Sequence, residues 1–224
     1  MKKRVRKILE ESRSAGWVIE PLAREVLKAY MLPLTRSRWA RTGEEALAAA
    51  RRIGYPVVAK IVSPDVVHKS EEGGVVTGIR DDDGMRRAYG RLSAIKGFAG
   101  VLVDETASGL ELFVGAKHDP QFGPVVLAGI GGTSVEIYRD VAVRMAPLSE
   151  KAAMEALHSL KGSALLRGYR GGAAVSTASA SRLLAAFSRA LIDLADSFES
   201  IDLNPVFCGS RRAVIADARI MLKK

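Results

Sequence analysis

Lys60, His68 and the glycine pair Gly73-Gly74 lie close together in the chain, and residues of these types could handle a phosphate group. Lys60 lies in the apolar run 57–62, and a second apolar run follows the glycines. A glycine loop between two strands lets backbone N–H groups surround a phosphate, whose charge the lysine would neutralise. Imidazole nitrogen is a competent nucleophile, so His68 could accept a phosphoryl group. The alternative is an ordinary hairpin with an exposed lysine, because one glycine pair is a weak signal.

The C-terminal end of the chain could hold a divalent cation. Residues 203–208 and 213–220 have the composition of two strands, and the turn between them covers 209–212. If the turn is centred on its middle bond, Asn204 lies opposite Asp217, with Cβ atoms about 5 Å apart. A carboxylate inside an apolar strand is costly unless a group such as a bound cation compensates it. The alternatives are a solvent-exposed face, an ion pair between Asp217 and an arginine, or a register slip that separates the two residues.

Two further sets of residues are weaker candidates. Glu105 and Glu111 flank the junction between the two halves of the chain, where a crevice is expected. Their carboxylates could hold ribose hydroxyls or an amino group, or they could be exposed loop residues. Gly131-Gly132 follows an apolar strand and could approach a phosphate or form a plain turn. No P-loop motif occurs in the sequence.

Helices alternate with strands in the first half of the chain, which predicts an α/β or α+β lobe. A helix is expected over 43–53, because Thr42 can cap it and Gly54 can end it. A turn or helix start over 81–84 leads into another helix over 84–95, and a strand follows at 101–105. The second half predicts three strands and two helices before the C-terminal hairpin, at 110–116, 124–129, 141–146, 150–160 and 179–197.

The composition is that of a globular protein with room for one domain or two small lobes: 224 residues, 48% hydrophobic and 26% charged. No apolar stretch reaches transmembrane length, and no secretory signal follows the basic residues 2–7. A single cysteine, Cys208, fits a cytoplasmic protein, and its apolar neighbours favour a core position. The net charge of +9 attracts anions, but aromatic residues do not alternate with basic ones, which argues against nucleic-acid binding as the main role.

Several segments resemble, in order, motifs of one enzyme family. They are 54–64, 68–70 with 73–75, 119–124, 129–132, 140–141 with 144–148, 202–205 and 217–219. The family is the β subunit of ADP-forming acetyl-CoA synthetases, which are NDP-forming acyl-CoA synthetases with an ATP-grasp fold. The resemblance covers roughly residues 20 to 220, and several long motifs in the same order are more specific than any single motif.

The resemblance implies two lobes that clasp a nucleotide. It divides the chain into a basic lead-in over 1–20, an N-terminal lobe over 21–104 with the phosphate-covering glycine loop, and a C-terminal lobe over 105–224 with the metal-binding hairpin.

The resemblance also implies roles for residues of the first lobe. Lys60 would contact the nucleotide phosphates, and Ser70, Gly73 and Gly74 would belong to the loop that covers them. His68 matches the family's second phosphohistidine, which relays a phosphoryl group to ADP.

The remaining implied contacts involve the hinge and the second lobe. Glu105 and Thr106 would meet adenine at the hinge, Glu111 suits the ribose, and Gly131-Gly132 would form a phosphate loop.

Asn204 and Asp217 match the family's magnesium ligands, in agreement with the register argued from the turn. The implied cofactor is therefore Mg²⁺, with ATP or ADP as substrate. The family reaction converts acyl-CoA, ADP and phosphate reversibly to acid, CoA and ATP. The CoA site and the first phosphohistidine belong to an α subunit. The chain is thus expected to be the β part of an α2β2 enzyme that is active only with its partner.

Some features leave other functions open. The chain departs from the family pattern at Glu71-Glu72 and Tyr169, and its basic N-terminus has no assigned role. One alternative is an ATP-grasp carboxylate ligase that acts alone through an acyl phosphate and does not need His68. Another is a non-catalytic module that senses nucleotides or binds nucleic acid, without magnesium-dependent nucleotide binding.

Overall fold

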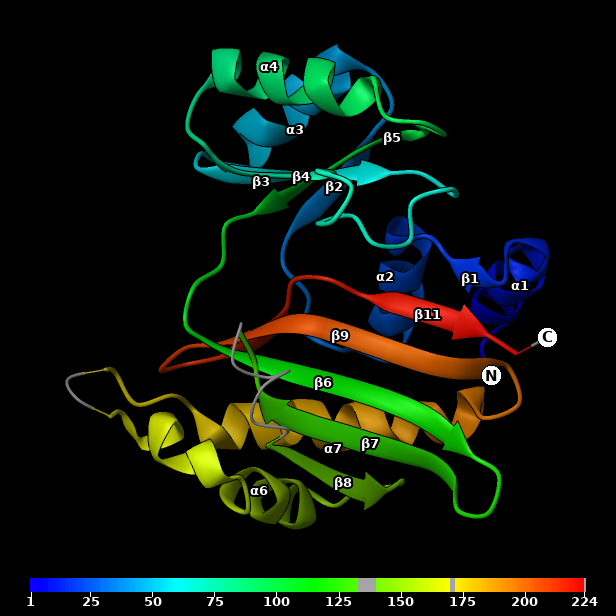
Figure 1. The fold of residues 1–224 in the computed structure, drawn as a ribbon, viewed down its shortest axis with the longest axis vertical. Coiled ribbons are helices and arrows are strands. Elements are labelled where there is room, and N and C mark those ends of the chain that lie inside the picture. Colours follow the sequence, from blue (N-terminus) through cyan, green and yellow to red (C-terminus); the bar gives the residue numbers. More distant parts are fainter. Residues whose placement is uncertain (133–139, 170–171, 224) are drawn as a thin grey trace. The chain divides into compact units, whose positions relative to one another are not determined.

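The computed structural model describes residues 1–132, 140–169 and 172–223, which fold into two compact units (Figure 1). The larger unit comprises Met1–Leu34 with Ser108–Lys224, and the smaller unit comprises Thr35–Ala107. Each unit has its own hydrophobic core. These units differ from the lobes expected from the sequence, because residues 21–34 pack with the C-terminal segment.

The smaller unit is a four-stranded antiparallel sheet with two helices. Its strands lie in the order β2 (Ser37–Ala40), β5 (Gly100–Glu105), β3 (Val57–Val62) and β4 (Val75–Ile79). Helices α3 (Gly43–Ile53) and α4 (Asp82–Ser93) lie together on one side of this sheet (Figure 1). Alanines of α3 and the side chains of Met85 and Leu92 of α4 form the core with apolar residues of the strands.

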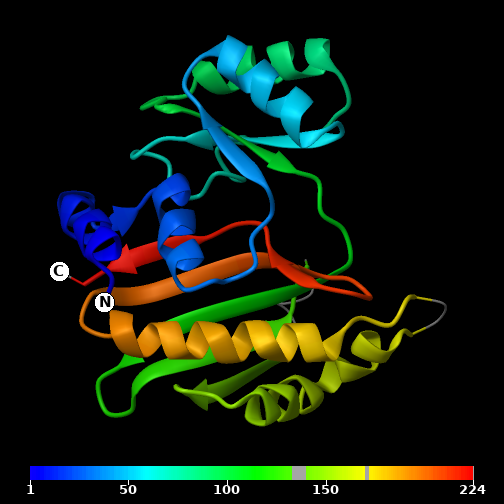
Figure 2. The same cartoon turned by 180° about the vertical axis from the view of Figure 1, so that it is seen from behind.

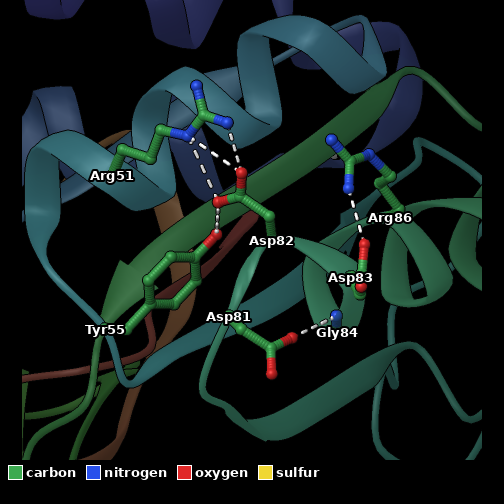
Figure 3. A network of polar contacts seen from close by, with 7 residues as sticks. All are labelled: Arg51, Tyr55, Asp81, Asp82, Asp83, Gly84 and Arg86. Carbon is green, nitrogen blue, oxygen red and sulfur yellow. Dashed lines mark hydrogen bonds and ion pairs between the residues drawn. The ribbon is translucent and has the colours of Figure 1, made fainter.

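The ends of these helices follow from their capping residues. Thr42 accepts a hydrogen bond from the backbone N–H of Glu45 at 3.2 Å, and Gly54 ends α3 with a φ of 95°. The helix α3 therefore has the predicted bounds. Asp81 caps α4 by accepting a hydrogen bond from the backbone N–H of Gly84 (Figure 3). This cap places the start of α4 at Asp82, within the segment 81–84 that was expected to be a turn or the start of the helix.

Arg51, in the last turn of α3, forms an ion pair with Asp82, in the first turn of α4 (Figure 3). The Tyr55 hydroxyl donates a hydrogen bond to the same carboxylate at 2.9 Å. Hydrogen bonds from Arg51 and Tyr55 hold the pKa of Asp82 below its usual value. Burial, together with the hydrogen bond to Asp82, raises the pKa of Tyr55 to about 12. The network ties the two helices of the smaller unit to each other.

In the larger unit, the described residues form a seven-stranded sheet, in which β10 (Ala213–Ile215) pairs with β9 and lies off the main strand order. The other strands follow the order β1 (Trp17–Val18), β11 (Arg219–Leu222), β9 (Phe198–Cys208), β6 (Leu110–Asp119), β7 (Gly123–Ile130) and β8 (Val141–Met145). Helices α6 (Glu150–His158) and α7 (Thr177–Leu194) cover one face of the sheet (Figure 2). Short 3₁₀ helices occur at Arg13–Ala15 and Lys161–Arg167.

The basic N-terminal segment is part of the larger unit. Helix α1 (Lys3–Glu11) buries Val5, Ile8 and Leu9 in the core of that unit. Helix α2 (Glu20–Ala29) carries a buried ion pair between Arg24 and Glu20 at 3.1 Å. Arg24 also donates a hydrogen bond to the carbonyl oxygen of Ala216 at 2.8 Å, which fixes α2 to the C-terminal segment.

The strands and helices predicted between residues 110 and 208 are present, with ends that differ by a few residues. The single strand predicted over 213–220 is instead divided into β10 and β11, with residues 216–218 between them. The short strands β1 and β2 were not predicted. Among the helices that the structure describes, none is long and apolar enough to cross a membrane.

Candidate functional site

Lys60 forms a buried ion pair with Asp104 in the smaller unit. Its Nζ lies 3.3 Å from Oδ2 of Asp104, and the two side chains are 8% and 2% exposed. Lys60 pairs with Leu102 across the β3–β5 ladder, so Asp104, two residues further along β5, is its diagonal neighbour on the same face. A buried ammonium group is stable only when it is paired, and Asp104 supplies a carboxylate partner. The pair therefore holds the lysine head group at a fixed place on the sheet.

Sequence reasoning did not single out Asp104. The signal was present, because Asp104 follows the apolar run Val101-Leu102-Val103 in a predicted strand. A carboxylate in such a run needs compensation, which is the argument that drew attention to Asp217.

The glycine pair closes its loop against the strand that carries Lys60. The Gly74 N–H donates to the carbonyl oxygen of Lys69 at 2.6 Å, and the Ile61 N–H donates to the carbonyl oxygen of Gly74 at 2.8 Å. A Cβ at Gly74 would lie 2.5 Å from Cγ2 of Ile61, and Gly73 has a φ of 64°. Only glycine fits both positions without strain. The loop is thus anchored beside Lys60.

His68 and Ser70 lie on the exposed part of the same loop. The His68 side chain is 58% exposed, and its Nδ1 lies 3.7 Å from Oε1 of Glu71, which is also exposed. The carbonyl oxygen of Ser70 accepts a hydrogen bond from the Gly73 N–H at 3.3 Å. The imidazole is therefore accessible from solution, while the loop backbone that carries it is hydrogen-bonded.

Glu105 and Thr106 are among the last residues of the smaller unit before the chain enters the larger one. The Glu105 carboxylate accepts a hydrogen bond from Arg36 Nε at 2.6 Å, and the Thr106 hydroxyl donates to the carbonyl oxygen of Pro56 at 2.9 Å. Arg36 lies just after the other connection between the units, at Leu34–Thr35. The contact between Arg36 and Glu105 therefore joins the two connecting segments where they meet the smaller unit.

Glu111, Gly131 and Gly132 come together in the larger unit, where β6 begins and β7 ends. The Gly131 N–H donates to the carbonyl oxygen of Glu111 at 2.6 Å. A Cβ at Gly131 would lie 3.0 Å from backbone and side-chain atoms of Glu111, and Gly132 has a φ of 92°. The absence of side chains lets the end of β7 approach Glu111 closely.

Asn204 and Asp217 occupy matching positions in the C-terminal hairpin. On the side nearer the turn, Ile215 pairs with Val206, and on the side farther from the turn, Arg219 pairs with Asp202. Both pairs have the register expected from the turn, but residues 216–218 belong to no strand, so the ladder is interrupted at Asp217. Asp217 Oδ1 also accepts a hydrogen bond from the Ala218 N–H at 3.0 Å. The same neighbourhood includes Glu111, because Glu111 pairs with Phe207 across β6 and β9.

The oxygen atoms of Asn204 and Asp217 suit magnesium better than a metal ion that takes all of its ligands from the protein. Within the described part of the chain, no group of three or more His, Cys, Asp and Glu side chains could hold a metal ion. Magnesium usually takes one or two carboxylates and fills its other positions with water and substrate phosphates. One carboxylate from Asp217 and one amide oxygen from Asn204 suit that pattern.

Cys208 is a buried core residue, as its apolar neighbours predicted. Burial raises the pKa of its thiol to about 12, so it stays protonated at neutral pH. Its burial and its protonated thiol argue against a nucleophilic role.

The candidate residues fall into one group in each unit. The group in the smaller unit consists of Lys60, His68, Ser70, Gly73, Gly74, Glu105 and Thr106. The group in the larger unit consists of Glu111, Gly131, Gly132, Asn204 and Asp217. The lysine and the glycine loop of the first group have the chemistry that suits a phosphate, and the oxygen donors of the second group suit a divalent cation.

Residues 8–222 match the family model of the ATP-grasp domain, so the chain belongs to the ATP-grasp family. It is 35% identical over 228 residues to acetate–CoA ligase (ADP-forming) I subunit beta of Pyrococcus furiosus, with 98% of each chain covered. It is 38% identical over 225 residues to acetate–CoA ligase (ADP-forming) I of Archaeoglobus fulgidus, with 97% of this chain but 32% of the relative covered.

A solved structure gives the same result. It is Ca. Korarchaeum cryptofilum dinucleotide forming acetyl-coenzyme A synthetase 1, in complex with coenzyme A and Mg-AMPPCP, with its phosphohistidine segment pointing towards the nucleotide binding site. The TM-score is 0.86 at 36% identity, and the match covers 98% of this chain and 100% of that chain. The predicted fold and the resemblance to the β subunit of ADP-forming acetyl-CoA synthetases are thus confirmed.

Proposed function

We propose that this chain is the nucleotide-binding β subunit of an ADP-forming acyl-CoA synthetase. With a CoA-binding α subunit, it would convert acyl-CoA, ADP and phosphate to acid, CoA and ATP. The observation that carries the proposal is the end-to-end match to a separate β subunit, which covers 98% of both chains. The assembly would be α2β2, and the single cysteine is compatible with work in a reducing cytoplasm.

Nucleotide phosphates would bind at Lys60 and the glycine loop. The ion pair with Asp104 holds the lysine in place, so little reorganisation is needed when a phosphate arrives. The loop backbone would supply further N–H donors, and Ser70, Gly73 and Gly74 would cover the phosphates. Phosphoryl transfer depends mainly on such positioning and on neutralisation of charge.

The other nucleotide contacts would come from the hinge and the larger unit. Glu105 and Thr106 would meet the adenine, Glu111 would hold ribose hydroxyls, and Gly131-Gly132 would approach a phosphate. Asn204 and Asp217 would hold Mg²⁺, which when bound neutralises charge on the phosphate oxygens.

His68 would carry the phosphoryl group. An imidazole nitrogen of His68 attacks the phosphorus of the phosphohistidine on the α subunit, and the P–N bond of that phosphohistidine breaks as the new one forms. The terminal phosphate oxygen of ADP then attacks phospho-His68, whose P–N bond breaks as the P–O bond of ATP forms. The exposed position of His68 on an anchored loop suits a group that must meet two reactants.

The test is reconstitution with the candidate α subunit. The isolated chain is expected to bind Mg·ATP and Mg·ADP but not to cleave acyl-CoA, whereas the mixture makes ATP from acetyl-CoA, ADP and phosphate. Cleavage of acyl-CoA by the isolated chain would contradict the proposal. ATP-dependent activation of a carboxylic acid by the isolated chain, unaffected by His68→Ala, would instead indicate the ligase that acts alone.

A further inference from the structure

The face of the large sheet that points away from α6 and α7 carries an apolar patch. Side chains alternate between the two faces along β7 and β8. Val126, Ala128 and Ala142 are buried in the core formed with the helices. Residues of the opposite phase include Val143 and Met145, which are 51% and 61% exposed. Large apolar side chains with this exposure on an ordered strand need an explanation.

The exposed residues form a continuous surface. Val125 pairs directly with Met145, and Leu127 pairs directly with Val143, so four apolar side chains lie together on this face. Phe113 extends the surface onto β6, because a Cβ at Gly115 would lie 2.9 Å from the Cζ atom of its ring. We call Phe113, Val125, Leu127, Val143 and Met145 the open patch.

The open patch reaches the edge of the sheet. Among the described strands, β8 is the last of the sheet order. Edge strands of stable monomers usually carry charges or prolines that prevent pairing with other chains. On β8, the charged residue Arg144 alternates with Val143 and Met145 and so lies on the other face of the sheet. Its guanidinium donates a hydrogen bond to the hydroxyl of Ser159, in the turn after α6. The patch therefore has the composition of the apolar centre of a stable interface.

The same face carries Glu111, one of the residues that we assign to the nucleotide. Glu111 lies two residues before Phe113 on β6 and therefore points to the same side of the sheet. A protein bound to the open patch would thus lie on the face that carries Glu111, which we assign to the ribose.

The relatives indicate which protein would bind the open patch. In Archaeoglobus fulgidus, the region matched by this chain is 32% of one long polypeptide, whereas the Pyrococcus furiosus relative is a separate subunit matched over 98% of its length. A domain that occurs as a separate chain must hold the rest of its enzyme by a surface rather than by a covalent link.

We infer that the open patch is the docking surface for the CoA-binding subunit, which packs an apolar surface across β7 and β8. This inference rests on the proposed function. Docking there brings the partner's phosphorylated group to the face that carries Glu111.

The test compares three variants of the chain in binding to the purified CoA-binding subunit from the same genome. Met145→Lys, and the double variant Val143→Thr with Met145→Lys, place polar groups in the patch. Ile192→Lys is the matched control, because Ile192 is 46% exposed on α7, on the other side of the sheet. We expect the dissociation constant to rise about tenfold or more for Met145→Lys, the loss typical of a central interface residue, and further for the double variant. The control should change it less than about twofold.

Each other outcome has a distinct meaning. Mg·ATP affinity of the isolated variants should equal that of the parent chain, which shows that they are folded. Unchanged affinity of Met145→Lys for the partner would overturn the docking inference and leave the proposed function intact. A dimer of the isolated chain that Met145→Lys dissociates, measured by light scattering, would assign the patch to a second copy and also overturn it. If the parent chain itself does not bind the CoA-binding subunit, the proposed function fails, and the docking inference fails with it.

Discussion

Lys60 and Asp104 lie on neighbouring strands with Nζ and Oδ2 3.3 Å apart, and both side chains are almost completely buried. The lysine expected to meet nucleotide phosphates therefore already has an anionic partner inside the protein. Removal of one member of a buried ion pair is costly because the other stays buried without its counter-charge. Removal of both members should cost much less than the sum of the two single removals, so the pair should show strong coupling.

A double-mutant cycle measures this coupling. We expect Lys60→Met and Asp104→Asn each to lower the free energy of unfolding of the protein by about 3 kcal/mol, and the double variant to cost little more than either single one. The control is the exposed pair of Asp83 and Arg86, whose side chains are 75% and 56% exposed, and its coupling energy should be below about 0.5 kcal/mol. Additive losses at Lys60 and Asp104 would contradict the buried pair.

Gly74 should not tolerate a side chain. A Cβ there would lie 2.5 Å from Ile61 Cγ2 and 3.0 Å from the Lys69 carbonyl oxygen, so Gly74→Ala must displace the loop or the strand. Crowding of this kind costs about 1–3 kcal/mol, and we expect a loss of that size in urea unfolding together with weaker Mg·ATP binding. Gly90→Ala is the control, because Gly90 lies within α4 with nothing within 4 Å of its Cβ position. That variant should gain about 0.5–1 kcal/mol. Equal stability of the two variants would show that the loop is loosely held.

The register of the hairpin was predictable because the position of the turn determines it, although the strand expected over 213–220 is divided into β10 and β11. Once the turn over 209–212 is placed, pairing of Ala213 with Cys208 and of Arg219 with Asp202 follows. Helix α3 was predictable for a similar local reason, since Thr42 and Gly54 mark its ends.

Elements that depend on distant partners were not predictable. Strand β1 has only two residues, Trp17 and Val18, and it pairs with β11 near the other end of the chain. Helix α1 seemed to be a basic lead-in, because Val5, Ile8 and Leu9 are spread among lysines and arginines, yet they reach the core. Strand β2 is a short edge strand whose polar residues gave no alternation of apolar side chains. In each case, the stabilising contact is tertiary rather than local.

Asn204 and Asp217 should determine the response of nucleotide binding to Mg²⁺. Asp217→Asn and Asn204→Ala each remove one expected ligand. We expect the Mg²⁺ concentration for half-maximal ADP or ATP binding to rise about tenfold, which corresponds to 1.4 kcal/mol of lost coordination. The fold should remain intact, as judged by unfolding in urea. Glu199→Gln is the matched control, because Glu199 is an exposed carboxylate on the same strand β9. An unchanged Mg²⁺ response in both hairpin variants would rule out the metal assignment.

His68 separates the relay from an enzyme that uses the nucleotide alone. Its imidazole is 58% exposed, on a loop whose backbone is fastened next to Lys60 by Gly74. Because the loop backbone and not the imidazole makes these contacts, His68→Ala should keep the affinity for Mg·ATP within about twofold. The same variant, assembled with the CoA-binding subunit, should lose synthesis of ATP from acetyl-CoA, ADP and phosphate, since no group is left to carry the phosphoryl group between the two sites. The assembled parent protein is incubated with γ-labelled ATP, and separate samples are then treated with acid or with alkali. The label on the peptide that contains His68 should be lost in acid and kept in alkali. The control is Glu71→Gln, which removes the carboxylate 3.7 Å from Nδ1 of His68 but leaves the imidazole in place, and it should retain labelling. Full ATP synthesis by the assembled His68→Ala protein would show that the phosphoryl group passes directly to ADP.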